Sequence, residues 1–199
     1  MEAPRPPTRT RPFRLPEWLK RQWSGHPIGF KLSALLISFN LASACSGQET
    51  NSPLPPEIRG LPLVQVISGE DAVRMTERLH GKAVAPSETH IGRYGTGSTH
   101  AMLYVSHFDS DQEAESVLAA MSASIGDGSS GFGHHEQFSI DRRGVHMVIG
   151  QGQVHFFFVR TADLFWLGMD AEMAREGLAQ LLGVAAEDVP ALESLLSGS

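Results

Sequence analysis

The feature that most constrains this chain is an apolar run at residues 32–44 (LSALLISFNLASA), which ends immediately before Cys45. Lys31 and six further Lys or Arg side chains precede the run, and small residues occupy its end. A basic segment, a short apolar run and small residues, in that order, are typical of a secretory signal peptide. The run has 13 residues, whereas a helix needs roughly 20 apolar residues to cross a bilayer. The sequence therefore predicts an exported protein and disfavours a permanent transmembrane helix.

The residues at the end of this run form a short motif in which Leu41, Ala42, Ser43 and Ala44 lead into Cys45. The motif resembles a bacterial lipobox, in which small residues precede a cysteine that is acylated and becomes the new N-terminus. The family prefers a large aliphatic residue three places before the cysteine, where this chain has Ala42. The resemblance implies a bacterial lipoprotein that is exported, anchored to the membrane through a lipid on Cys45, and exposed to the periplasm or the exterior.

Cys45 is also the only cysteine of the chain. It has no intramolecular disulfide partner, and acylation accounts for an unpaired thiol at an exported N-terminus. Two alternatives stay open. An ordinary signal peptidase could cleave after the small residues 42–44 and release a soluble product, or the run could remain as an uncleaved anchor behind an incorrectly assigned start at Met1.

The charge of the chain is unevenly distributed between its two ends. Residues 1–45 hold seven of the 16 basic residues and two of the 22 acidic residues. The remaining residues therefore carry nine basic and 20 acidic side chains, a net charge of -11. An acidic domain repels phosphate backbones and anionic head groups, so the sequence excludes nucleic acid as a partner and predicts no docking to lipid through basic patches.

Composition divides the chain into three parts. Residues 1–45 form the export signal, and residues 46–60 are polar and Pro-rich, which predicts a flexible tether. Residues 61–199 have the length and apolar content of one independent domain.

Hydrophobic spacing and turn residues define the elements of that domain. Strands are expected over 61–67, 89–94, 100–108, 133–140, 145–149, 154–160 and 164–169, and helices over about 69–80, 110–125 and 170–182. The first six elements follow the order βαββαβ, which predicts an α+β domain of ferredoxin-like type, an antiparallel sheet with helices on one face, extended by a strand meander and a C-terminal helix. A strongly curved sheet wrapped around one helix is the alternative that the same order permits.

Histidine is abundant in the exported part, and imidazole is a common ligand of zinc, copper and nickel. The best candidate metal ligands are His134 and His135 on one expected strand, with His146 and His155 on the next two strands. Neighbouring strands could bring some of them together on one face of the sheet. Half-exposed polar strand faces explain the same pattern without any metal.

A second candidate binding site groups His90, Arg93 and Tyr94 near a glycine-rich turn. The segments 131–133 and 150–153 are also glycine-rich, but neither stands between a strand and a helix with dinucleotide spacing, so the sequence predicts no cofactor. No Gly-x-Ser-x-Gly segment supports a serine hydrolase.

These observations favour a tethered, non-catalytic module of the cell envelope that binds a small ligand or an envelope protein, or serves in assembly. A metal-binding or metal-dependent domain built on the meander histidines is the first alternative. A small periplasmic enzyme that uses Arg93, Tyr94 and a histidine is the second.

Overall fold

A computed structural model describes residues 52–80, 86, 88–126 and 130–197. The export signal, Cys45 and the first part of the expected tether lie outside these residues. The described residues belong to one compact unit of the chain. None of the helices among them is long and apolar enough to cross a membrane.

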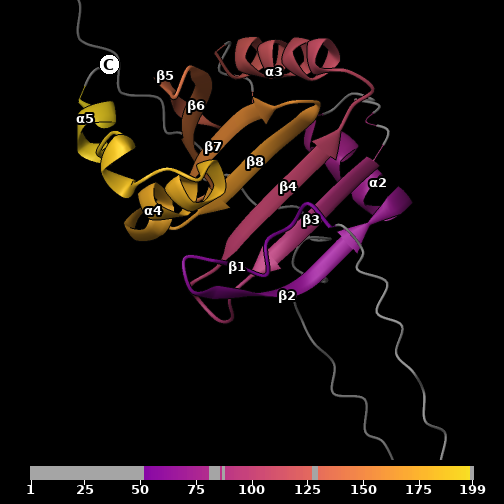
Figure 1. Cartoon of the computed structure of the whole chain (residues 1–199), viewed down its shortest axis with the longest axis horizontal. Coiled ribbons are helices and arrows are strands. Elements are labelled where there is room, and N and C mark those ends of the chain that lie inside the picture. The colour runs from indigo at the N-terminus through magenta and orange to yellow at the C-terminus, as the bar shows by residue number, and fades with distance from the viewer. Residues whose placement is uncertain (1–51, 81–85, 87, 127–129, 198–199) are drawn as a thin grey trace, which may run out of the picture. The chain divides into compact units, whose positions relative to one another are not determined.

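Eight strands form one curled antiparallel sheet in the order β1-β2-β3-β4-β8-β7-β6-β5 (Figure 1). The strands are β1 (Glu57–Ile58), β2 (Leu61–Ser68), β3 (Glu88–Tyr94), β4 (Ala101–His107), β5 (Gly133–Ile140), β6 (Arg143–Gly150), β7 (Gln153–Arg160) and β8 (Asp163–Met169). The helices are α2 (Gly69–His80), α3 (Asp111–Gly126), α4 (Ala171–Leu182) and α5 (Leu192–Leu196), with a 3-10 turn, η1 (Ala186–Asp188), between the last two. The expected strands and helices are present in the expected order, with β1 as an additional strand before them, and the α+β class is confirmed.

The ferredoxin-like start is not confirmed. That arrangement needs a parallel pair between its first and third strands, whereas β2 pairs antiparallel with β3. The third long strand, β4, then pairs with β8, the last strand of the meander. After β4 the chain crosses to the far side of the sheet through α3 and returns to β8 through three hairpins. Every neighbouring pair of strands is antiparallel as a result.

The helices do not share one face of the sheet, which corrects the prediction that they would. Side chains alternate along β7, so Phe157 packs on α3 residues such as Leu118, while Phe156 and Phe158 join the core that contains Leu178 of α4. We call these two surfaces the α3 face and the α4 face. β7 and β8 carry apolar residues on both sides, because helices cover both faces of these strands.

The folded part begins before residue 61. Leu54 is 6% exposed and Ile58 is fully buried, and both belong to the core of the α4 face. The amide of Leu63 donates to the carbonyl of Pro56 at 2.8 Å. The expected tether of residues 46–60 thus has, at its C-terminal end, a segment that packs on the sheet.

Candidate functional site

The four candidate metal ligands lie on the three strands where they were expected, but they do not converge. The imidazoles of His135 and His146 form a pair, with Nε2 of His135 3.1 Å from Nδ1 of His146. The Nε2 atom of His134 lies 3.2 Å from the carbonyl oxygen of Leu196 in α5. His155 has other partners. Within the residues that the structure describes, no group of three or more His, Cys, Asp or Glu side chains could hold a metal ion.

The histidine pair begins a row of stacked rings across the α3 face. The ring centroids of His146 and Phe157 are 4.8 Å apart, and those of Phe157 and Trp166 are 4.9 Å apart, with interplanar angles of 15° and 14°. The register produces this row, because His146 lies directly opposite Phe157, and Phe157 directly opposite Trp166. We call His135, His146, Phe157 and Trp166 the ring row. Aromatic pairs across strands stabilise a sheet, so the row has a structural role.

His155 lies beside the ring row and is held in one tautomer. The indole Nε1 of Trp166 donates to Nδ1 of His155 at 3.1 Å, and Nε2 of His155 donates to the carbonyl of Gly150 at 3.1 Å. Trp166 can only donate at this atom, so Nδ1 of His155 carries no proton. Burial lowers the pKa of His155, which favours the same neutral form.

Close packing around His155 also requires glycine at position 168. A Cβ atom at Gly168 would lie 2.7 Å from Nδ1 of His155, closer than such contacts allow. Phe132 covers the other side, with its ring edge-on to the rings of both His155 and Trp166. His155 is therefore buried, and each of its two ring nitrogens makes a hydrogen bond.

The His135–His146 pair is less enclosed than His155. His146 is buried, and its pKa is lowered by that burial and by the neighbouring imidazole of His135. His135 is half-buried, and its Nε2 also lies 3.4 Å from the hydroxyl of Ser122 on α3. At this distance one imidazole can donate a hydrogen bond to the other, and the contact with Ser122 links the pair to α3.

The second candidate site is divided by the alternation of β3. Tyr94 is fully buried in the core of the α4 face, His90 lies on the same face, and Arg93 lies on the opposite face. The hydroxyl of Tyr94 donates to the carbonyl of Pro55 at 3.1 Å. Burial raises the pKa of Tyr94. Tyr94 thus anchors the N-terminal segment, and the three residues do not form one site.

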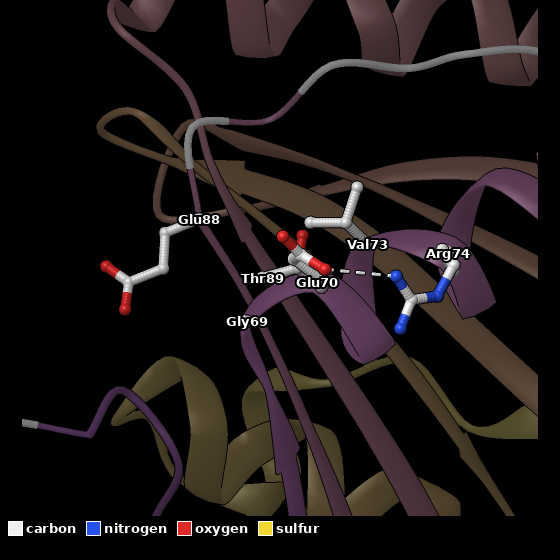
Figure 2. A pocket seen from close by; sticks show the side chains of 6 residues that line it. All are labelled: Gly69, Glu70, Val73, Arg74, Glu88 and Thr89. Atoms are coloured by element: carbon white, nitrogen blue, oxygen red, sulfur yellow. Dashed lines mark hydrogen bonds and ion pairs between the residues drawn. The ribbon is translucent and has the colours of Figure 1, made fainter.

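Two hollows lie on the surface of the described residues. The first, of about 360 Å³, is lined by residues at the starts of α2 and β3: Gly69, Glu70, Val73, Arg74, Glu88 and Thr89. Figure 2 shows Glu70 paired with Arg74, at 3.2 Å, while Glu88 extends away from them. The second, of about 420 Å³, lies between the β6–β7 turn and the helices α4 and α5. Its lining is mostly apolar and includes Ile149, Leu192 and Leu196, with Glu172 and Glu193 beside them.

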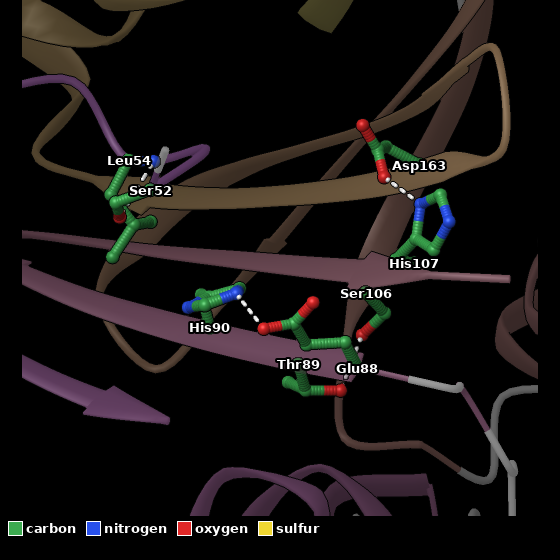
Figure 3. Close-up of polar contacts among 8 residues, drawn as sticks. All are labelled: Ser52, Leu54, Glu88, Thr89, His90, Ser106, His107 and Asp163. Atoms are coloured by element: carbon green, nitrogen blue, oxygen red, sulfur yellow. Dashed lines mark hydrogen bonds and ion pairs between the residues drawn. The ribbon is translucent and has the colours of Figure 1, made fainter. Parts of the chain in front are cut away.

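Sequence reasoning missed a group of polar pairs at one end of β3, β4 and β8 (Figure 3). His90 pairs with Glu88 at 2.8 Å, and Nδ1 of His107 lies 2.7 Å from a carboxylate oxygen of Asp163. Glu88 lies opposite His107 in the register, and His107 opposite Asp163. No local motif could reveal the His107–Asp163 pair, because β4 and β8 are far apart in the sequence. Glu88 and His107 are exposed, so both pairs are open to solvent.

The most unusual surface of the described residues is the outer edge of β2. β1 covers only its first two residues, and no other strand of the described residues pairs with the outer side from Val64 to Ser68. Val64 is 43% exposed and Val66 is 50% exposed, and they are two of the three exposed large hydrophobic residues among those described. We call the segment Val64–Ser68 the open edge. Sheets usually protect such an edge with charges or irregularities. This segment contains no charged residue, but its register with β3 shifts between Leu63 and Gln65, which places one irregularity at Val64.

The outer strand at the other end of the sheet, β5, is irregular as well. Its register shifts between Gly133 and Glu136, and His134 within this stretch has a positive φ of 58°. A bulge of this kind, with His and Glu side chains around it, interrupts the pairing of a further strand. Both outer strands thus contain an irregularity, and they differ in charge, because Glu136 lies on β5 and β2 has no charged residue.

Comparisons with protein-family models, with curated proteins and with solved structures gave no match.

Proposed function

We propose that this chain is a lipid-anchored protein of the cell envelope that serves as a non-catalytic assembly module, and that it binds its partner by β-strand addition to β2. The observation that carries this proposal is the open edge, with Val64 and Val66 exposed beside main chain that no strand in the described part of the protein pairs. An extended segment can add to such an edge through main-chain hydrogen bonds, while side chains of alternate residues provide specificity.

The partners of the other candidate residues support a binding role over an enzyme. His155 is committed to Trp166 and Gly150, and Tyr94 to the carbonyl of Pro55. A buried group with both of its hydrogen-bonding positions occupied is a poor acid, base or ligand, because its use would leave a partner unsatisfied. The metal-dependent alternative retains the His135–His146 pair, which supplies two of the three or four protein ligands that zinc sites use.

The lipid anchor is tested by replacing Cys45. We expect Cys45→Ala to lose all acylation, because the thiol is the group that receives the lipid, and to leave the membrane fraction. Intact-mass measurement of the purified protein and fractionation of the envelope check this. Wild-type protein with the mass of an unmodified chain would contradict the anchor, whatever its location.

Strand addition is tested with a photo-reactive residue at the open edge. We expect p-benzoylphenylalanine at Val64 to give a discrete adduct in the envelope, because the partner strand lies beside it. The same residue at Ser116, exposed on α3, is the matched control and should give none. Val66→Lys should abolish the adduct from position 64, because a lysine at an edge strand opposes pairing.

Two results would contradict strand addition. One is the absence of any adduct at position 64. The other is an adduct that persists unchanged in the Val66→Lys chain, provided that its thermal unfolding matches that of the wild type.

A further inference from the structure

We propose that the His135–His146 pair is a binding site for Cu(I), held in linear coordination between Nε2 of His135 and Nδ1 of His146. The site is independent of strand addition, because β5 and β6 form the end of the sheet opposite to β2. Three features of the pair point to this ion: the way in which the two rings face each other, the number of ligands that they supply, and the irregularity of β5 beside them.

The two imidazoles face each other end to end. Their facing nitrogens are 3.1 Å apart, their ring centroids are 5.4 Å apart, and the ring planes differ by 22°. The centroid distance exceeds the nitrogen distance by about the diameter of one ring, so both nitrogens lie close to the line between the centroids. The in-plane lone pairs of Nε2 of His135 and Nδ1 of His146 are therefore aimed at one point. The hydroxyl of Ser122 borders that point, 3.4 Å from the same Nε2.

This geometry serves a hydrogen bond and a linear metal bridge equally well. Without metal, one facing nitrogen carries the proton and donates to the other. With metal, the donor ring takes its other tautomer, so both facing nitrogens present a lone pair to the ion. Both rings stay neutral, no net proton is released, and a linear contact through hydrogen becomes a linear contact through the metal.

The number of ligands selects the ion. Zinc sites use three or four protein ligands. Among the residues that the structure describes, no third His, Cys, Asp or Glu joins this pair in a group that could hold a metal ion. Cu(I) has a filled d shell and forms stable linear complexes with two ligands, and imidazole is a ligand that copper accepts. The net charge of -11 on the exported residues attracts a cation to the domain.

The irregularity of β5 allows the pair to open. A metal–nitrogen bond is about 2 Å long, so an ion between the rings requires the two nitrogens to separate from 3.1 Å to about 4 Å. His146 is fixed, because it is 5% exposed and stacks on Phe157. His135 is half-buried on the outermost strand, within the stretch where the register shifts between Gly133 and Glu136. Bulges re-aim side chains beside functional sites. One ligand is thus fixed and the other adjustable.

Titration with silver nitrate, followed by nitrogen-15 NMR of the histidine side chains, tests the site. Ag(I) is the air-stable analogue of Cu(I) and prefers the same linear geometry. The full chain carries Cys45→Ala, because a free thiol is a stronger ligand for soft ions than imidazole. We expect equimolar silver to shift the signals of Nε2 of His135 and Nδ1 of His146. Both signals should also split through coupling to the magnetic silver nucleus, which requires a direct bond.

Two glutamine substitutions on β5 separate the pair from its surroundings. His135→Gln should weaken silver binding by at least roughly tenfold, the loss that removal of even an outer-shell partner of a metal causes. His134→Gln is the matched control, because Nε2 of His134 lies beside the carbonyl of Leu196 and outside the pair, and it should bind silver as tightly as the parent chain. Thermal unfolding without metal checks that both variants are folded.

Three results would overturn the site. One is silver that binds without splitting the signals of these two nitrogens, as it would through methionine sulfur. Another is zinc chloride that shifts the same nitrogens at the same concentration, because zinc would then replace the two-coordinate ion. The third is Cu(I), added in the absence of oxygen, that fails to displace silver from the pair. Displacement by Cu(I) with no response to zinc supports the assignment, whatever the photo-crosslinking at the open edge shows.

Discussion

Phe157→Ala should reduce the free energy of unfolding by about 3–5 kcal/mol, the cost of removing a fully buried aromatic side chain and leaving a cavity. Phe157 has no exposed surface, and it packs against the α3 residues Leu118 and Met121 in one core cluster. Its ring also lies between those of His146 and Trp166. The substitution thus removes apolar contact with α3 and interrupts the ring row at its centre.

Urea unfolding, followed by circular dichroism, measures this loss. Phe157→Leu is the matched control, because it keeps most of the apolar volume and removes only the ring, and it should lose less than about 1.5 kcal/mol. A loss below about 1 kcal/mol for the alanine variant would contradict the packing of α3 on this face. Equal losses for the two variants would show that the stacked ring, and not buried volume, dominates at this position.

Stability should fall as the pH is lowered below about 6.5, the ordinary pKa of histidine. The pKa values of His146 and His155 are both lowered in the folded state, chiefly by burial. Below about pH 6.5 the unfolded chain therefore binds protons that the folded chain does not, and this difference stabilises the unfolded state. The loss continues until the pH falls through the folded-state pKa values, and each histidine contributes at most about 1.4 kcal/mol per pH unit.

Urea unfolding at a series of pH values between about 8 and 5 measures this dependence. His155→Gln removes one of the two titrating groups and should reduce the slope below about pH 6.5, although the variant is less stable at every pH. A wild-type slope of zero across this range would contradict the neutral, buried state of both imidazoles.

Local patterns predicted the helices and strands well. The helix expected over 110–125 is α3, and at its start the hydroxyl of Ser110 accepts the amide of Glu113 at 3.2 Å. The helix expected over 170–182 is α4, and it ends at Gly183, which has a positive φ of 72°. These features depend on residues a few positions apart, so their physical cause is present in the sequence itself.

The candidate site was harder to predict, because it depends on register. The four meander histidines share neighbouring strands, yet only His135 and His146 have imidazoles in contact. Trp166 is aligned with Phe157 by the β7–β8 hairpin and then takes Nδ1 of His155 as its acceptor. The packed segment of Leu54 and Ile58 was likewise not predicted, because two isolated apolar residues in a polar, Pro-rich stretch give no periodic pattern.

By itself, the sequence determined the order of the strands and helices, their approximate ends and the α+β class, since spacing, capping and turn residues act over short distances. Only the tertiary structure decided that β4 pairs with β8, that α3 and α4 cover opposite faces, and that β2 is left with an open edge. Those outcomes depend on contacts between residues far apart in the chain, whose pairing the apolar pattern permits in more than one arrangement.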